Sequence, residues 1–161
     1  MLVCLNCWEV YEYTALKDEM GYGMPCPKKG CDGAVEDIDE CILPAIRLLN
    51  EKGYYTTYCC SGHYWDNEGS GYSYPYISFI PEIEVDVFKN IPDGFVIDHD
   101  ASTGVVLRLY LRHQDTVKLH MEILKAAVRL IKWAKKLPAL EDDFEMVEGE
   151  VVVDGQADPT V

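Results

Sequence analysis

Two stretches of the chain have the hydrophobic spacing of amphipathic helices. The first runs from about residue 37 to residue 50 and the second from about residue 114 to residue 136. Apolar residues recur in them every three or four positions, at Ile42, Ile46 and Leu49 and at Val117, Met121, Leu124, Val128 and Ile131. Asp37 or Asp39 is placed to cap the first helix, and Gly53 to end it. We therefore expect two main helices, each with these positions as its apolar stripe.

Between and beside the helices the pattern changes to runs of β-branched and aromatic residues, which predict strands. The runs are residues 54–60, 76–80, 95–98 and 105–111, with a short helix at 84–90, a loop at 64–74 and a hairpin loop at 101–104. Two helices and about four largely antiparallel strands predict an α+β fold, a two-layer domain that spans residues 37–137.

Four cysteines precede this domain in two close pairs, Cys4 with Cys7 and Cys26 with Cys31. Zinc takes four thiolates in a tetrahedron, and short spacings let a turn present both sulfurs of a pair. A set of four cysteines leaves no open position, so we expect a structural zinc ion in a ribbon of residues 1–36. The alternating run at residues 8–13 predicts a strand of this ribbon.

The formal net charge of -14 is concentrated at the end of the chain. Residues 138–161 hold eight of the 28 acids and no Lys or Arg, so we treat them as an acidic tail. This charge disfavours non-specific binding to nucleic acid. No apolar run reaches the roughly 18 residues of a membrane span, and the N-terminus has no signal-peptide pattern. The odd cysteine count also argues against a disulfide framework, and together these features predict a cytoplasmic protein.

The central stretch of residues 54–63 is the best candidate for a second site. Cys59 and Cys60 are neighbours in a predicted strand, so their side chains point to opposite faces. The backbone N–H groups of the turn that follows can converge on an anion or a carboxylate. The candidate ligand-binding residues are Cys60, Ser61, Gly62, His63, Tyr72 and His120. A purely structural turn, a metal site and a Cys60 nucleophile paired with His63 remain open, and no catalytic residue is assigned.

Residues 55–63 (YTTYCCSGH) resemble the "YxTTSSCSGR" stretch of the wybutosine-synthesising tRNA methyltransferase family. That resemblance implies an α+β core, S-adenosylmethionine as cofactor and methylation of a tRNA guanosine. Cys60, Ser61 and Gly62 match the family's "CSG", whereas His63 replaces its arginine. The stretch is also similar to small bacterial and phage proteins that have a zinc ribbon before a "GYxTxYCCSGH" motif, a likeness that implies no activity.

Three functions follow as hypotheses. The first is a zinc-ribbon α+β protein that binds a small adenosyl or nucleotide-like ligand beside residues 60–63. One alternative is an S-adenosylmethionine-dependent RNA methyltransferase, which needs a basic strip. The other is a non-enzymatic, acidic interaction protein or phage-type inhibitor that captures a protein partner through its tail or its ribbon. The basic strip would comprise Arg108, Arg112, Lys118, Lys125 and Lys132.

Overall fold

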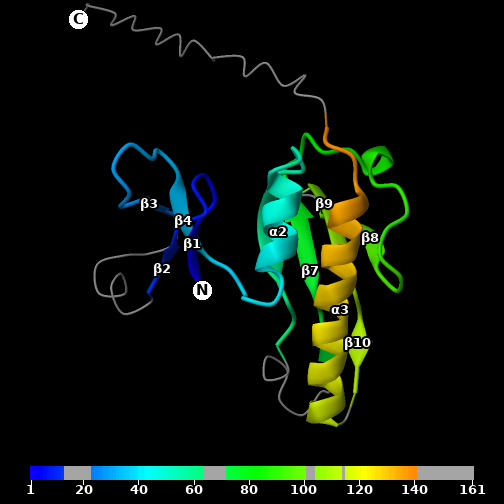
Figure 1. Ribbon diagram of the computed structural model, residues 1–161. Coiled ribbons are helices and arrows are strands. Elements are labelled where there is room, and N and C mark those ends of the chain that lie inside the picture. Colours follow the sequence, from blue (N-terminus) through cyan, green and yellow to red (C-terminus); the bar gives the residue numbers. More distant parts are fainter. Residues whose placement is uncertain (13–22, 64–71, 101–103, 114, 141–161) are drawn as a thin grey trace, which may run out of the picture.

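A computed structural model describes residues 1–12, 23–63, 72–100, 104–113 and 115–140 of the chain. A small N-terminal sheet lies beside a larger domain that contains both helices (Figure 1). None of the described helices is long and apolar enough to cross a membrane.

The N-terminal sheet has four short antiparallel strands in the order β2-β1-β4-β3. They are β1 (Leu2–Cys4), β2 (Val10–Tyr11), β3 (Met24–Pro25) and β4 (Ala34–Asp37). The strand expected at residues 8–13 is shorter than predicted, since only Val10 and Tyr11 pair with β1 within the described part of that run. Trp8 has a left-handed φ of 57°, and its N–H donates to the Cys4 carbonyl at 2.9 Å, so it closes a turn instead.

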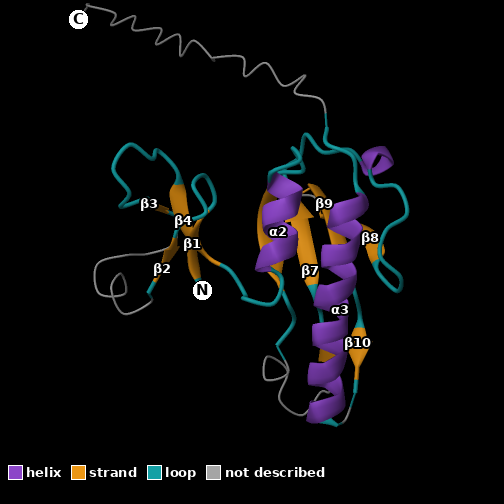
Figure 2. Ribbon diagram, viewed as in Figure 1, coloured by secondary structure: helices purple, strands orange, loops and turns teal. Residues whose placement is uncertain are grey.

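The larger domain confirms the expected two-layer α+β fold. Its main sheet has the antiparallel order β5-β7-β9-β8, and a two-stranded pair, β6 with β10, continues beside it. The helices α2 and α3 lie side by side on one face of the main sheet (Figure 2). The elements are α2 (Leu43–Asn50), β5 (Thr56–Cys60), β6 (Tyr72–Ser73), β7 (Tyr76–Phe79), the 3-10 turn η1 (Val85–Val87), β8 (Val96–Asp100), β9 (Gly104–Arg108), β10 (Leu111–Arg112) and α3 (Thr116–Lys136).

The α3 helix packs on the core with a different face from the one predicted. Val117, Met121, Leu124 and Val128 are exposed, whereas Ile131 is partly buried. The buried positions are Leu119, Ile123, Ala126, Ala127, Leu130, Trp133 and Ala134. Both faces of the helix are apolar, and three alanines on the buried face allow α3 to lie close to its neighbours. Asp115 caps the helix by accepting hydrogen bonds from the Val117 and Lys118 N–H groups.

The N-terminal sheet is attached to the larger domain by a few specific contacts. Leu5 and Trp8 pack against the main core, and the Arg47 guanidinium lies 5.7 Å from the centroid of the Trp8 ring. The amino group of Met1 donates a hydrogen bond to the carbonyl of Ile38 at 2.9 Å, and Ile38 is part of the main core. These contacts hold the ribbon next to strand β5, which is an edge of the main sheet.

Candidate functional site

The four predicted zinc ligands come together at one end of the N-terminal sheet. The Sγ atoms of Cys4 and Cys31 are 3.7 Å apart, and those of Cys7 and Cys26 are 3.8 Å apart. Four sulfurs bound at about 2.3 Å to a tetrahedral ion are separated by about 3.8 Å. The cluster therefore has the dimensions of a tetrahedral thiolate site and could hold a metal ion.

Local turns place these cysteines. The Cys31 N–H donates to the Lys28 carbonyl at 3.0 Å, and Gly30 between them has a left-handed φ of 81°. The Cys26 N–H donates to the Gly33 carbonyl at 2.8 Å. A Cβ atom at Gly33 would lie 2.9 Å from the Cys4 sulfur, so only glycine lets the chain pass this close to the cluster.

One thiol of the cluster is already close to its ionised form. Burial raises the pKa of Cys26, but hydrogen bonds from the Tyr11 hydroxyl and from the Lys28 backbone outweigh burial and lower that pKa to about 7. The Tyr11 oxygen lies 3.0 Å from the Cys26 sulfur. Because metal ions bind the thiolate, the lowered pKa of Cys26 favours metal binding. The pKa of Cys31 is instead raised to about 12, since its backbone hydrogen bond with Gly33, which lowers that pKa, is outweighed by burial and by the hydrogen bonds with the other three thiols.

The second candidate site is a corner where β5 ends. His63 Nε2 lies 2.9 Å from Asp39 Oδ1, and the Ser61 N–H donates to Asp39 Oδ2 at 2.7 Å. On the other side of the imidazole, His63 Nδ1 lies 3.9 Å from the Cys60 sulfur. The corner therefore aligns a thiol, an imidazole and a carboxylate, each partly buried.

Asp39 is the residue of this corner that the sequence analysis missed. It was expected to cap the first helix, but α2 begins at Leu43 and has no side-chain cap. Burial raises the pKa of Asp39, while the hydrogen bonds from Ser61 and His63 lower it more, so the net pKa is below its ordinary value. The Ser61 N–H binds a carboxylate, but this carboxylate belongs to the chain itself, and the Gly62 N–H donates to the Cys60 sulfur instead of converging on the same group.

Gly62 is the tightest point of the corner. It has a φ of 79°, and a Cβ atom there would lie 2.8 Å from the Pro75 ring and closer still to the Ser73 hydroxyl oxygen. Ser73 is buried, and its hydroxyl has no hydrogen-bond partner among the described residues. Only glycine lets the chain pass this close to Ser73 and Pro75.

The two adjacent cysteines have different environments. Burial, assisted by the charge of Asp39, raises the pKa of Cys59 to about 12. The Cys60 sulfur instead accepts a hydrogen bond from the Gly62 N–H at 3.3 Å and faces the His63 imidazole. Cys59 is thus an inert thiol, and the chemistry of the corner belongs to Cys60.

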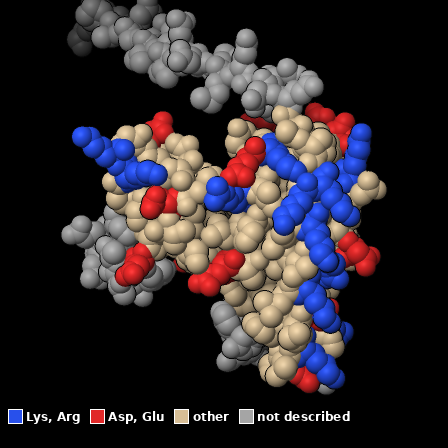
Figure 3. Space-filling view, in the orientation of Figure 1, with Lys and Arg blue, Asp and Glu red and all other residues tan. Residues whose placement is uncertain are grey.

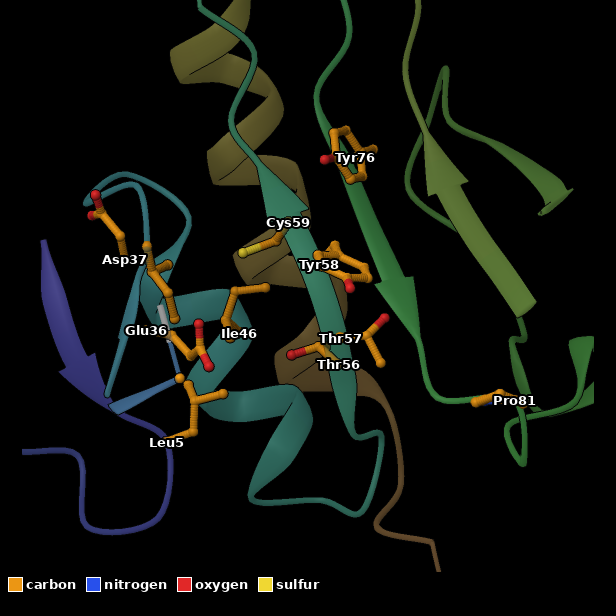
Figure 4. Close-up of a pocket in the computed structure, with 12 residues that line it drawn as sticks. Leu5, Glu36, Asp37, Ile46, Thr56, Thr57, Tyr58, Cys59, Tyr76 and Pro81 are labelled. Atoms are coloured by element: carbon orange, nitrogen blue, oxygen red, sulfur yellow. The ribbon is translucent and has the colours of Figure 1, made fainter. Parts of the chain in front are cut away.

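An open groove of about 810 Å³ lies between the ribbon and β5 (Figure 4). The Glu36 carboxylate and the Cys59 thiol point into it from opposite sides, and the rings of Tyr58 and Tyr76 line it. Among the described residues that line it, two are acidic and none is Lys or Arg. Of these acids, Asp37 is paired with the N-terminal amino group, and burial raises the pKa of Glu36.

The remaining predicted ligand residues are not joined to this arrangement by the described contacts. The backbone of Tyr72 forms β6, but its side chain lies outside the described residues. His120 is exposed on α3. The hydrogen bonds of the corner come from Asp39 and residues 60–63.

Comparisons with known proteins add no assignment to these sites. No protein-family model, no curated protein and no solved structure matches this chain. The geometry of the two clusters and of the groove therefore carries the functional argument.

Proposed function

We propose that Cys4, Cys7, Cys26 and Cys31 bind one structural zinc ion. The observation that carries this proposal is the pair of sulfur–sulfur distances, 3.7 and 3.8 Å, which match a tetrahedral thiolate site. The buried hydrophobic residues in the described part of the ribbon are few: Val3, Cys4, Cys26 and Val35. A core of this size is too small to hold a fold without a metal ion or another cross-link.

Metal analysis of the purified full-length protein tests this proposal. We expect one zinc ion per chain by native mass spectrometry, and loss of that ion in a Cys26→Ser variant. The matched control is Cys41→Ser, which removes a partly buried thiol outside the cluster and should retain the zinc. A protein that binds no zinc after refolding with the metal would refute the assignment.

We further propose that a small adenosyl-type ligand binds in the groove between the ribbon and β5. This differs from the position beside residues 60–63 that the sequence predicts, since none of the six predicted ligand residues is among the described residues that line the groove. Support comes from its size, which is in the range of small-molecule sites, and from the Tyr58 and Tyr76 rings that line it. The Glu36 carboxylate, together with a described lining that contains no Lys or Arg, favours a cationic or neutral ligand over a phosphorylated one. S-adenosylmethionine, whose sulfonium is cationic, fits this charge better than a nucleotide does.

Isothermal titration with S-adenosylmethionine, adenosine and ATP tests the ligand. Binding of S-adenosylmethionine should weaken in Glu36→Gln, whereas the exposed control Glu84→Gln should bind like the wild type. Flat titrations with all three compounds would count decisively against an adenosyl ligand. Preferential binding of ATP would contradict the charge argument.

A single observation favours the alternative of an RNA methyltransferase. Lys118, Lys125 and Lys132 recur every seven residues on α3, and basic side chains form a continuous row along this helix (Figure 3). Arg108, which the predicted strip included, instead pairs with Asp98 at 3.5 Å. If the row binds RNA, Lys125→Glu should reduce tRNA retention in filter-binding assays at low salt. Retention equal to that of the wild type would remove this alternative.

The third hypothesis, an interaction protein that acts through its acidic tail, stays a prediction. Residues 141–161 lie outside the described part of the chain. Deletion of residues 138–161 is expected to abolish capture of a protein partner if the tail is the binding element.

A further inference from the structure

We propose that Cys60 is a nucleophilic thiol, activated by His63 and oriented through Asp39, that attacks an electrophilic carbon of a small molecule at the corner. The inference goes beyond the zinc and adenosyl-ligand proposals, because it requires neither of them. It rests on the order of three groups: the Cys60 sulfur, the His63 imidazole and the Asp39 carboxylate.

The carboxylate determines which imidazole nitrogen carries the proton. Asp39 Oδ1 lies 2.9 Å from Nε2 of His63, and an ionised carboxylate can only accept hydrogen bonds. A neutral His63 therefore holds its proton on Nε2 and presents the lone pair of Nδ1 to the thiol. The Ser61 N–H fixes the second oxygen of Asp39 at 2.7 Å, so the carboxylate is held in place from two directions.

The backbone favours a thiolate at the same position. The Gly62 N–H points at the Cys60 sulfur from 3.3 Å, and a donor of this kind stabilises the charged form of an acid. Among the described residues, no such contact is made by Cys59, whose pKa is raised by burial.

The reaction step requires no oxidant and no metal. The thiol proton of Cys60 moves to Nδ1 of His63, and the sulfur forms a bond to the electrophilic carbon. The bond from that carbon to its leaving group breaks, and the leaving group departs with the electron pair. Where the leaving group needs a proton, His63 Nδ1 returns the one it received.

A metal site at the same three residues is the competing explanation, since their ligand atoms lie within 4.8 Å of one another. The hydrogen bond between His63 and Asp39 argues against a metal site. If a metal ion were bound at Nδ1 of His63, Asp39 would still accept the hydrogen bond from Nε2 and orient the ring, and it would not coordinate the metal. Only Cys60 and His63 would then remain as ligands among the described residues, whereas zinc prefers four.

Alkylation with iodoacetamide tests the proposal without knowledge of the natural substrate. The experiment uses the full-length, zinc-loaded protein with Cys59→Ser, so that Cys41 and Cys60 are the thiols outside the ribbon. Peptide mass spectrometry follows both rates. At pH 7 we expect Cys60 to react about tenfold faster than an ordinary thiol, since few unperturbed thiols are ionised there.

The variant His63→Ala should slow the alkylation of Cys60 at pH 7 by about tenfold, and the difference should vanish near pH 9.5, where any exposed thiol ionises unaided. Asp39→Asn should have a smaller effect in the same direction. Recovery at high pH separates loss of activation from loss of structure, and accelerated labelling of Cys41 would reveal unfolding of a variant. If His63→Ala unfolds, the same comparison is made with His63→Gln.

Three results would overturn the proposal. The first is a Cys60 that reacts no faster than Cys41 at pH 7, and the second is a rate that His63→Ala leaves unchanged. The third is a second zinc ion per chain that protects Cys60 from iodoacetamide. Failure of the ribbon proposal has a different signature, which is labelling of Cys4, Cys7, Cys26 and Cys31 in protein treated with zinc.

Discussion

The replacement of Gly62 by alanine is the sharpest test of the corner geometry. Gly62 has a φ of 79°, and the new Cβ atom would lie 2.8 Å from Cδ and 2.9 Å from Cγ of Pro75. The left-handed conformation costs a residue with a Cβ roughly 1–2 kcal/mol. Forcing an extra carbon against a packed ring adds about 1–3 kcal/mol. Since Pro75 is itself buried and rigid, we expect Gly62→Ala to lower the free energy of unfolding by about 3 kcal/mol.

Gly94→Ala is the matched control for this change. Gly94 has nearly the same φ, 80°, but its Cβ atom would meet only the flexible end of Leu109 at 3.3 Å. We expect the control to lose about 1 kcal/mol, mainly from the backbone. Urea unfolding of the zinc-loaded proteins, followed by helical circular dichroism, measures both, because the described helices belong to the larger domain. If the two variants are equally stable, the close approach of Gly62 to Ser73 and Pro75 is not as described.

Three further predictions follow from individual contacts. Ile123→Ala should lower the free energy of unfolding by about 3 kcal/mol, because Ile123 is 4% exposed. Leu124→Ala should lower it by less than about 1 kcal/mol, because Leu124 is 38% exposed. Equal losses of the two variants in urea unfolding would contradict the packing of α3. The pKa of Asp39 is lowered in the folded protein, so its stabilising effect is complete above the unfolded-state pKa and is lost as pH falls through the folded value. The loss in free energy of unfolding caused by Asp39→Asn, measured by urea unfolding, should therefore be largest near neutral pH and should shrink below about pH 4. A loss that becomes larger as the pH falls would refute this pH dependence. Removal of zinc by a chelator should abolish hydrogen-exchange protection in β1 to β4 while α3 stays protected. The reason is that the ribbon buries few apolar residues of its own. Protection that survives in the metal-free ribbon would show that the metal is dispensable.

Local patterns were sufficient to predict most of the secondary structure. The stop at Gly53 is confirmed, since this residue has a left-handed φ of 85° and its N–H donates to the Asn50 carbonyl. The proximity of the four cysteines also followed from their spacing, because short loops leave few ways to arrange two close pairs. In both cases the interactions that decide the structure join residues that are near one another in sequence.

The burial of α3 did not follow from its pattern. The sequence contains two apolar stripes on this helix, and periodicity detects each of them equally well. The stripe that includes Val117 and Leu124 is exposed, while the stripe that includes Ile123 and Leu130 faces the core. The packing of α3 against α2 decides between the two stripes, and that packing exists only in the folded domain.

The sequence by itself therefore determined the four-cysteine cluster, the order of the two main helices and the four strands of the main sheet, and the turn after Cys60. The tertiary structure alone decided the role of Asp39, which local rules assign to a helix cap. Its hydrogen-bond partners, Ser61 and His63, are 22 and 24 residues further along the chain. Only the packing of the α2 segment beside β5 brings this carboxylate to the imidazole, and a contact made by packing leaves no periodic signal in the sequence.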